Sequence, residues 1–333
     1  MSRLTISMNV LAVAILITVA TAANADTLAV RCGGKVGLTS IGSAVRLLQG
    51  ESAGGPNRIT VSGACLENVL IQNMNLLTIS GTNGASITDA SGGAADVVDI
   101  RNSSVTITGM AIDGQSGINN DAVDCEQGSH CTLVGNTIIG AADSVGVYAL
   151  SSALVVGGTL QGGTFSGIFA RGDVAASGVL ITGTPVGIMV LKGGRMVATV
   201  ADPASVAIGS LTQTNVVNSG GAGVTVSEGA LFQCSGCVIR NNSGDGIDAD
   251  VSAVVIVQPA FLLNGTRVLP SVRNNVGVGV SLGDLTSGSF HGPALPIAVF
   301  GNAQPDIVCR SALTVSRGAL AAAGGAMHTN CAN

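Results

Sequence analysis

Gly167-Ile168-Phe169-Ala170 and Gly187-Ile188-Met189-Val190 are two copies of the short pattern that decides the fold of this chain. The pattern is a glycine, then Ile or Val, any residue, and then Ala or Val. Most copies begin roughly 20–25 residues after the one before, which is the period of stacked repeat architectures. Further copies lie at residues 146–149, 223–226, 246–249 and 277–280, and two weaker ones at 98–100 and 123–125.

Each copy predicts a short β-strand with one buried face, because its apolar residues alternate. We expect the preceding glycine to permit a sharp corner. A period of this length holds three strands and three turns, which make one coil, and coils stacked at about 4.8 Å share a continuous core. An antiparallel sandwich rarely keeps one signature at a near-constant spacing. The sequence therefore predicts an all-β, right-handed parallel β-helix over residues 59–315, with inserted loops at 191–222 and 257–276.

The composition suits many short strands joined by tight turns. The chain has 333 residues, including 48 Gly, one Tyr and no Trp. Its mean hydropathy of +0.56 is too high for a disordered chain. Its net charge is −5, and its 14 basic residues are spread along the sequence. Nucleic-acid binding needs clustered Lys and Arg, so we expect no nucleic-acid partner.

The first 25 residues have the features of a secretory signal peptide. Arg3 gives a positive start, residues 10–19 form an apolar core, and Ala23-Asn24-Ala25 gives a small-x-small cleavage site. No later stretch is long and apolar enough to span a membrane. The sequence therefore predicts a secreted or periplasmic protein without a membrane span after cleavage.

Both ends of the solenoid carry patterns of caps, which cover otherwise open strand edges. The N-terminal cap is predicted at residues 26–58. There Thr39 or Ser40 would N-cap an amphipathic helix that ends at Gly50, with an apolar face of Ile41, Ala44, Val45 and Leu48. The Ala/Gly-rich residues 316–333 are predicted to form the C-terminal cap.

Eight cysteines in an exported chain predict four disulfides. The spacing alone does not fix their connectivity. Cys234 and Cys237 have the spacing of a redox motif, but no helix follows to lower a thiolate pKa, which favours a structural bridge or two free thiols. Pairing of nearest neighbours is the simplest prediction, giving Cys32–Cys65, Cys125–Cys131, Cys234–Cys237 and Cys309–Cys331.

The run Ile59-Thr60-Val61-Ser62-Gly63-Ala64-Cys65-Leu66-Glu67-Asn68-Val69, followed by Leu77-Thr78-Ile79-Ser80-Gly81, resembles the opening coils of bacterial right-handed β-helix repeat proteins. These belong to the pectin-lyase-like superfamily, and the resemblance covers most of residues 55–315. It implies the fold. The superfamily includes lyases, hydrolases, esterases and adhesins, so the resemblance leaves the function open.

Alignment of the coils by their apolar residues predicts an acidic patch. Asp99 and Asp124 become neighbours, beside Arg101 and Glu126, with Asp121 and Asp143 at the corner. Asp99, Asp124 and Glu126 could hold Ca²⁺, which prefers oxygen ligands. The arrangement resembles that of pectate lyases, which implies Arg101 or Arg171 as the base. The alternative is an Arg101–Glu126 ion pair with solvated aspartates.

A second resemblance concerns hydrolases. Asn120-Asp121-Ala122-Val123-Asp124, followed by Gly128-Ser129-His130, resembles the aspartate segment of polygalacturonase-type enzymes. It implies Asp121 and Asp124 as acid–base residues. The Gly-His-Gly and Arg-Ile-Lys segments of that family do not follow. We expect His130 to be a turn residue.

Three residues are predicted to bind substrate. Tyr148 and Phe169, placed next to each other in one outward column, could stack on a sugar. Lys192, beside Arg171, could receive an acidic polymer. The string from Asn241 to Asp248 could bind Ca²⁺, but Asn and Asp also stabilise tight turns, and we expect a turn there.

Three hypotheses about the function follow from these observations. Because catalytic segments are missing, the sequence favours a non-catalytic secreted β-helix that presents an extended surface to a polysaccharide, a cell-surface component or a protein. The alternative is a pectate-lyase-like enzyme that acts on acidic polysaccharide with Ca²⁺, with a glycoside hydrolase less favoured. A self-associating structural surface protein is a third reading.

Overall fold

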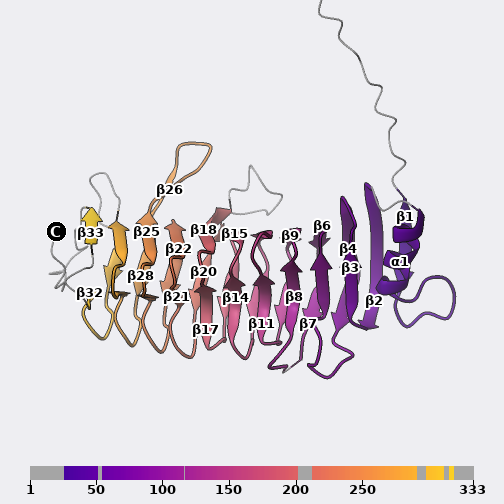
Figure 1. Ribbon diagram of the computed structural model, residues 1–333, viewed down its shortest axis with the longest axis horizontal. Helices are drawn as coiled ribbons and strands as arrows, with labels where there is room; N and C mark the ends of the chain where they lie inside the picture. The colour runs from indigo at the N-terminus through magenta and orange to yellow at the C-terminus, as the bar shows by residue number, and fades with distance from the viewer. Residues whose placement is uncertain are drawn as a thin grey trace, which may run out of the picture.

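The chain folds into a long stack of three-sided coils, as the computed structural model shows (Figure 1). The structure describes residues 26–51, 55–115, 117–201, 212–290, 298–310 and 315–318. The predicted signal peptide, Cys331 and most of the predicted C-terminal cap lie outside these ranges. Within them, almost every element is a short β-strand, and the repeat of the sequence is confirmed as a parallel β-helix.

One side of the stack is a sheet of ten parallel strands, here called the site sheet. Each strand comes from a successive coil, so residues twenty or more apart in the chain lie side by side. Its strands are β3 (Val69–Gln72), β5 (Val98–Arg101), β8 (Asp121–Glu126), β11 (Asp143–Val147), β14 (Ser166–Ala170), β17 (Val186–Val190), β21 (Val224–Val226), β24 (Ile247–Ala249), β29 (Val280–Leu282) and β32 (Ile307–Cys309).

In the described residues a second sheet of 21 strands, which includes the short antiparallel strand β19 (Thr212–Gln213), bends round the other two sides. On the second side lie β1 (Thr27–Arg31), β2 (Asn57–Leu66), β4 (Leu77–Thr88), β6 (Ser104–Thr108), β9 (His130–Val134), β12 (Ser152–Val156), β15 (Asp173–Ser177), β18 (Arg195–Ala201), β22 (Leu231–Ser235), β25 (Val254–Gln258), β30 (Ser287–Phe290) and β33 (Val315–Gly318). On the third side lie β7 (Ala111–Asp113), β10 (Thr137–Ile139), β13 (Thr159–Gln161), β16 (Leu180–Thr182), β20 (Asn215–Val217), β23 (Val238–Arg240), β28 (Ser271–Arg273) and β31 (Ala298–Phe300).

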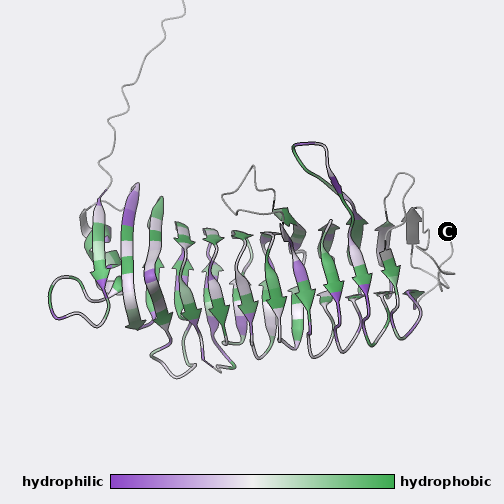
Figure 2. Ribbon diagram, turned by 180° about the vertical axis from the view of Figure 1, so that it is seen from behind, coloured by the Kyte–Doolittle hydropathy of each residue, from purple (hydrophilic) through white to green (hydrophobic). Residues whose placement is uncertain are grey.

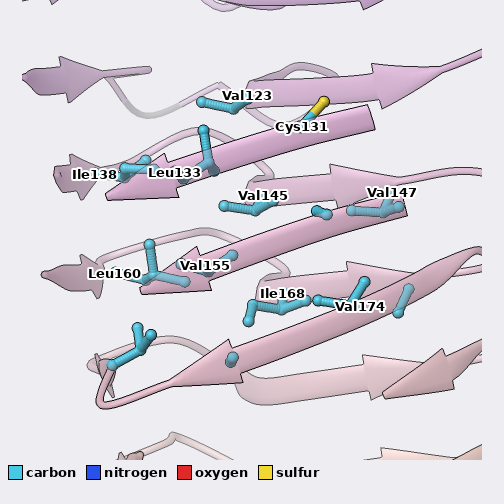
Figure 3. Packing of buried hydrophobic residues seen from close by; sticks show 14 of the residues in the cluster. Val123, Cys131, Leu133, Ile138, Val145, Val147, Val155, Leu160, Ile168 and Val174 are labelled. Atoms are coloured by element: carbon cyan, nitrogen blue, oxygen red, sulfur yellow. The ribbon is translucent and has the colours of Figure 1, made fainter. Parts of the chain in front are cut away.

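The interior of the stack is a continuous apolar core. Val123, Val145 and Ile168 lie one above another on successive coils, and all are fully buried (Figure 3). Figure 2 shows hydrophobic segments alternating with hydrophilic ones along the coils, as expected of strands with one buried face. Each coil thus buries its apolar residues against the coils on either side.

Helix α1 (Ile41–Glu51) lies at the N-terminal end of the stack (Figure 1). The predicted capping helix is confirmed, although it ends one residue after Gly50. Its predicted apolar face is at most 1% exposed. Ser40 Oγ accepts a hydrogen bond from the Ser43 N–H, as an N-cap residue does. The Glu67 carboxylate accepts two more, from the backbone N–H groups of Ile41 and Gly42.

The prediction that the repeat glycines permit sharp corners is wrong for Gly167 and Gly187. Gly167 and Gly187 are absent from the described residues with positive φ, so they make no left-handed corner. Instead, a Cβ on Gly167 would lie 2.4 Å from Ile181 Cγ2 and 2.7 Å from the carbonyl oxygen of Gly187. These glycines are needed because neighbouring strands approach too closely for a side chain.

Polar ladders run along two corners of the stack. The backbone N–H of Ser103 donates to Ser129 Oγ, and the N–H of Ser129 donates to Ser151 Oγ. In later coils the N–H of Asn242 donates to Asn275 Oδ1, and the N–H of Asn275 donates to Asn302 Oδ1. Each rung satisfies a buried corner amide with a side chain from the next coil, which keeps the coils in register.

The disulfides follow the nearest-neighbour prediction. Cys32–Cys65, Cys125–Cys131 and Cys234–Cys237 are bonded. Cys309 is also disulfide-bonded, although its predicted partner is not described. Cys234 and Cys237 are fully buried in the core, which makes their bridge structural.

Two insertions interrupt the coils where the long intervals predicted them. Near the first, β19 (Thr212–Gln213) pairs antiparallel with β18. The second is a hairpin of β26 (Ala260–Phe261) and β27 (Arg267–Val268) that projects from the stack (Figure 1). No helix in the described parts of the chain is long and apolar enough to cross a membrane.

Candidate active site

The acidic patch begins with the predicted pairing of β5 and β8. Asp99 lies opposite Asp124, and Arg101 lies opposite Glu126. The Arg101 guanidinium bridges its neighbours, with Nη2 2.7 Å from an Asp99 oxygen and Nε 2.8 Å from Glu126 Oε1. The predicted Arg101–Glu126 ion pair is therefore present, and it includes Asp99.

This ion pair bears on the predicted calcium site. Oxygens of Asp99, Asp124 and Glu126 lie within 4.8 Å of one another, and carboxylates are the ligands that Ca²⁺ prefers. However, Arg101 is already ion-paired with two of the three. The hydrogen bond from Arg101 to Asp99 also raises the pKa of Arg101, which keeps the guanidinium charged. A calcium ion would compete with Arg101 for these carboxylates, so the calcium site and the role of Arg101 as a base both stay predictions.

The predicted column that placed Tyr148 beside Phe169 is wrong by two residues. Asp124 pairs with Gly146, and Gly146 pairs with Phe169. Because the apolar residues alternate with a period of two, Val145-Gly146-Val147 and Val147-Tyr148-Ala149 fit the strand pattern equally well. The pattern alone therefore does not decide whether Gly146 or Tyr148 occupies the outward column. The copies at residues 246–249 and 277–280 would likewise align Asp248 with Gly279, but Asp248 pairs with Ser281, so the register is again shifted by two residues.

The corrected register creates a pocket, which the sequence did not predict. Gly146 leaves the outer face of β11 bare, and the Asp121 carboxylate lies over it, where a Cβ would be 1.9 Å from Asp121 Oδ2. Tyr148 follows β11 and donates from its hydroxyl to Asp121 Oδ2 at 3.3 Å. The pocket has a volume of about 480 Å³, and its lining residues are Ile118, Asn119, Asp121, Ala142, Asp143, Tyr148, Thr164, Phe165, Phe169 and Arg171.

Three aspartates from two adjacent coils are buried in this region, and two of them, Asp121 and Asp143, line the pocket. Asp121, Asp124 and Asp143 are each 5–6% exposed. Asp143 is opposite Asp121 in the register, and its carboxylate accepts a hydrogen bond from Ser166 Oγ. Asp124 Oδ1 is buried without a hydrogen-bond partner. In the described ranges, no basic side chain lies within ion-pair distance of these three carboxyl groups.

Burial without a cation raises the pKa of each aspartate. Desolvation, with the nearby charges of Asp143 and Asp124, raises the pKa of Asp121 to about 9. Desolvation and the charge of Asp96 raise the pKa of Asp124 to about 8. Burial also raises the pKa of Asp143, to about 6, although hydrogen bonds from Ser166 act against the rise. At neutral pH the pocket therefore holds a protonated Asp121 and an ionised Asp143.

Aromatic rings form one wall of the pocket. The Tyr148 and Phe169 ring centroids are 5.7 Å apart, so the two rings meet even though they occupy different columns. Phe165, which the sequence reasoning did not single out, lies 6.4 Å from Phe169 and is half exposed. Its only signal in the sequence is its place two residues before a repeat glycine. Together the rings offer an apolar surface next to the carboxyl groups.

The two predicted basic residues differ in position. Arg171 lines the pocket, and its guanidinium carbon is 5.0 Å from the Phe169 ring centroid. Its Nε is buried and has no hydrogen-bond partner. Lys192 is exposed at the turn after β17 and is not among the lining residues.

Two other sequence motifs, His130 and the string 241–248, make contacts within the fold. His130 lies on β9, on the second side of the stack, where its Nδ1 is 2.7 Å from Ser152 Oγ. It is thus a strand residue rather than the predicted turn residue. In the string 241–248, Asn242 belongs to the asparagine ladder, and Asp245 Oδ1 accepts a hydrogen bond from the Val278 N–H. These contacts support the predicted structural turn.

The raised pKa values predict that stability falls with increasing pH. An unfolded Asp121 ionises near its ordinary pKa of 3.8, whereas the folded one stays protonated up to about pH 9. The stability it contributes at acid pH is therefore lost as the pH rises from about 4 towards 9. We expect the Tm of the chain to fall between pH 5 and pH 9 by at least about 5 °C more than that of Asp121→Asn. Parallel Tm–pH curves for the two proteins would contradict this.

Comparisons with known proteins add little to this geometry. No protein-family model matches the chain, and no curated protein matches it. The crystal structure of alginate lyase from Paenibacillus sp. str. FPU-7 aligns over 92% of this chain and 99% of that chain, with 11% identity and a TM-score of 0.29. A likeness at this identity and TM-score assigns neither a family nor a function to the chain.

Proposed function

We propose that this protein is a carbohydrate-active enzyme that hydrolyses acidic polysaccharide by acid–base catalysis. The observation that carries the proposal is a group of buried aspartates at the edge of a pocket with an aromatic wall, with no basic side chain of the described residues within ion-pair distance. A structural carboxylate is normally paired, because leaving it buried and unpaired destabilises the fold. Strongly raised pKa values in a pocket are typical of catalytic groups.

The pKa values divide the roles. Asp121, protonated at neutral pH, is the proposed general acid, which gives its proton to the departing glycosidic oxygen as the C–O bond breaks. Asp143, ionised at neutral pH, is the proposed general base, which takes a proton from the water that attacks the sugar. Asp124 is the second candidate for the acid, since its pKa is also above neutrality.

Hydrolysis fits these residues better than the lyase reaction. In the lyase hypothesis, carboxylates hold calcium while an arginine removes a proton. Arg101 is instead held between Asp99 and Glu126, which are two of the three proposed metal ligands. An arginine in two ion pairs is a poor base.

The substrate class rests on Arg171. Its guanidinium lines the pocket and belongs to none of the ion pairs of the described residues, so it could bind a carboxylate on the sugar while Phe165 and Phe169 stack on the ring. Membership of the pectin-lyase-like superfamily and a secreted or periplasmic location belong to the same proposal. The disulfides favour an oxidising compartment.

Incubation with a panel of acidic polysaccharides tests the proposal. We expect new reducing ends, without the ultraviolet absorbance of unsaturated uronate ends that a lyase forms. The rate should be bell-shaped in pH, with one limb near pH 6 from Asp143 and one near pH 9 from Asp121. Absorbance rising with each new reducing end would support the lyase instead. Tight binding without any cleavage would support the non-catalytic surface.

A further inference from the structure

Two arginines stand next to each other on the third side of the stack, away from the pocket. Arg240 of β23 is opposite Arg273 of β28, which in turn is opposite Phe300 of β31. Their strand neighbours Ile239 and Val272 are fully buried, so the arginines point outward. Parallel strands are about 4.8 Å apart, and two like charges at that separation repel each other.

No acidic side chain of the described coils neutralises this pair. None of the ion pairs there includes Arg240 or Arg273. Arg273 stacks on Phe300, with its guanidinium carbon 5.9 Å from the ring centroid, but its Nε is buried without a hydrogen-bond partner. Ser271 Oγ, on the same side of β28, is also buried and unpartnered. Buried donors without partners are uncommon. An anion bound at the outward guanidinium groups would compensate the charge of the pair.

The acidic residues of the neighbouring turns are used by the fold. Asp245 Oδ1 accepts a hydrogen bond from the Val278 N–H at 2.7 Å. Asp306 Oδ1 accepts one from Asn302 Nδ2, and Asp248 pairs with Arg310. These carboxylates have partners of their own, which leaves the arginine pair available to an external anion.

A second hollow lies along the stack between the pocket and the coils that carry the arginine pair. Thr164 and Phe165 of the pocket lie in the turn after β13, and Gly163 of the same turn lines a second hollow of about 710 Å³. Its other lining residues, in the turns after β16 and β20, are Gly183, Thr184, Pro185, Val186, Asn218, Gly220 and Gly221. Arg240 and Arg273 end the strands of the next two coils. They lie roughly 14 and 19 Å along the stack from the turn after β13, at about 4.8 Å per coil.

We propose that Arg240 and Arg273, with Phe300, form a distal site for a linear polyanionic glycan whose other end occupies the pocket. The hollow is open and has no charged residue in its lining, so a polymer can cross it between the two sites. The recognised chemistry is a row of carboxylate or sulfate groups. The statement that one polymer reaches both sites rests on the proposed function.

Direct binding measurements on the whole chain test the site. The probes are long polygalacturonate, its trimer, dextran sulfate, neutral dextran and a single-stranded DNA oligonucleotide, all at one salt concentration. The variant is Arg240→Gln/Arg273→Gln. The control is Arg31→Gln/Lys35→Gln, which removes the same charge from exposed residues near the N-terminal end. We expect the variant to bind at least one long anionic glycan about tenfold more weakly, with trimer binding unchanged and the control like wild type.

Three results would overturn the site: equal affinity of variant and wild type for every long polymer, an equal loss in variant and control, or tighter binding of DNA than of either glycan. Tighter binding of polygalacturonate would show that the site prefers carboxylate groups, and tighter binding of dextran sulfate would show that it prefers sulfate groups. Binding is scored without turnover. If no polysaccharide is cleaved but the variant still loses polymer affinity, the proposed function falls and the distal site stands.

Discussion

Asp121→Asn should lower kcat for polysaccharide hydrolysis by about 10²–10⁴-fold, the usual contribution of a positioned general acid. Asparagine has nearly the same shape, but it has no proton to give to the leaving oxygen. Asp121 is neutral at pH 7, so the substitution replaces one uncharged group by another and should not disturb the fold. KM should change little, because the acid acts mainly in the transition state.

Asp173→Asn is the matched control, since Asp173 is exposed on the second side of the stack. It should leave kcat within about twofold of wild type, as expected of a surface position. Reducing-end assays on both variants, with a thermal melt to check folding, make the comparison. Full activity in Asp121→Asn would remove this residue as the acid. Loss in Asp124→Asn instead would transfer the role to Asp124.

Phe232→Ala should cost the folded state about 3–5 kcal/mol of stability, the largest effect that we expect from a single core substitution. Phe232 is fully buried on β22, between Met196 and Val255 of the neighbouring coils. The interior of a stacked coil is fixed by backbone pairing on every side, so the coils can collapse little into the cavity that the ring leaves.

Phe261→Ala provides the control for that loss. Phe261 lies on the projecting hairpin and is 67% exposed, so its removal should change stability by less than about 0.5 kcal/mol. Urea denaturation of both variants gives the two values from the shift in midpoint at equal m. A cost below about 1 kcal/mol for Phe232→Ala would show that the core is less tightly packed than the structure describes.

The fold was accessible from the sequence because it depends on a local, repeated pattern. Alternating apolar residues at a near-constant spacing are enough to predict stacked parallel strands, and so the pairing of Asp99 with Asp124 was predicted correctly. The cap helix was predictable for a related reason. Its N-cap Ser40 and its apolar face lie within one short segment.

The pocket was not accessible in the same way. Val145-Gly146-Val147-Tyr148-Ala149 offers two strands of equal pattern, and only pairing with Val123 and Cys125 decides between them. That choice puts Gly146 under the Asp121 carboxylate. The pocket also depends on the turns before β8 and β14, and the repeat pattern of the sequence does not determine the conformation of these turns. Burial of three aspartates therefore could not be inferred from their spacing alone.

The Ser and Asn ladders make the fold modular in length. Because each rung joins the amide of one coil to a side chain of the next, a coil with the same corner residue can be spliced between two others without leaving an orphan amide. Duplication of the gene segment that encodes one coil is then a small evolutionary step. Each added coil would lengthen the surface available to a bound polymer by one strand spacing. The residues of the proposed active site would not change.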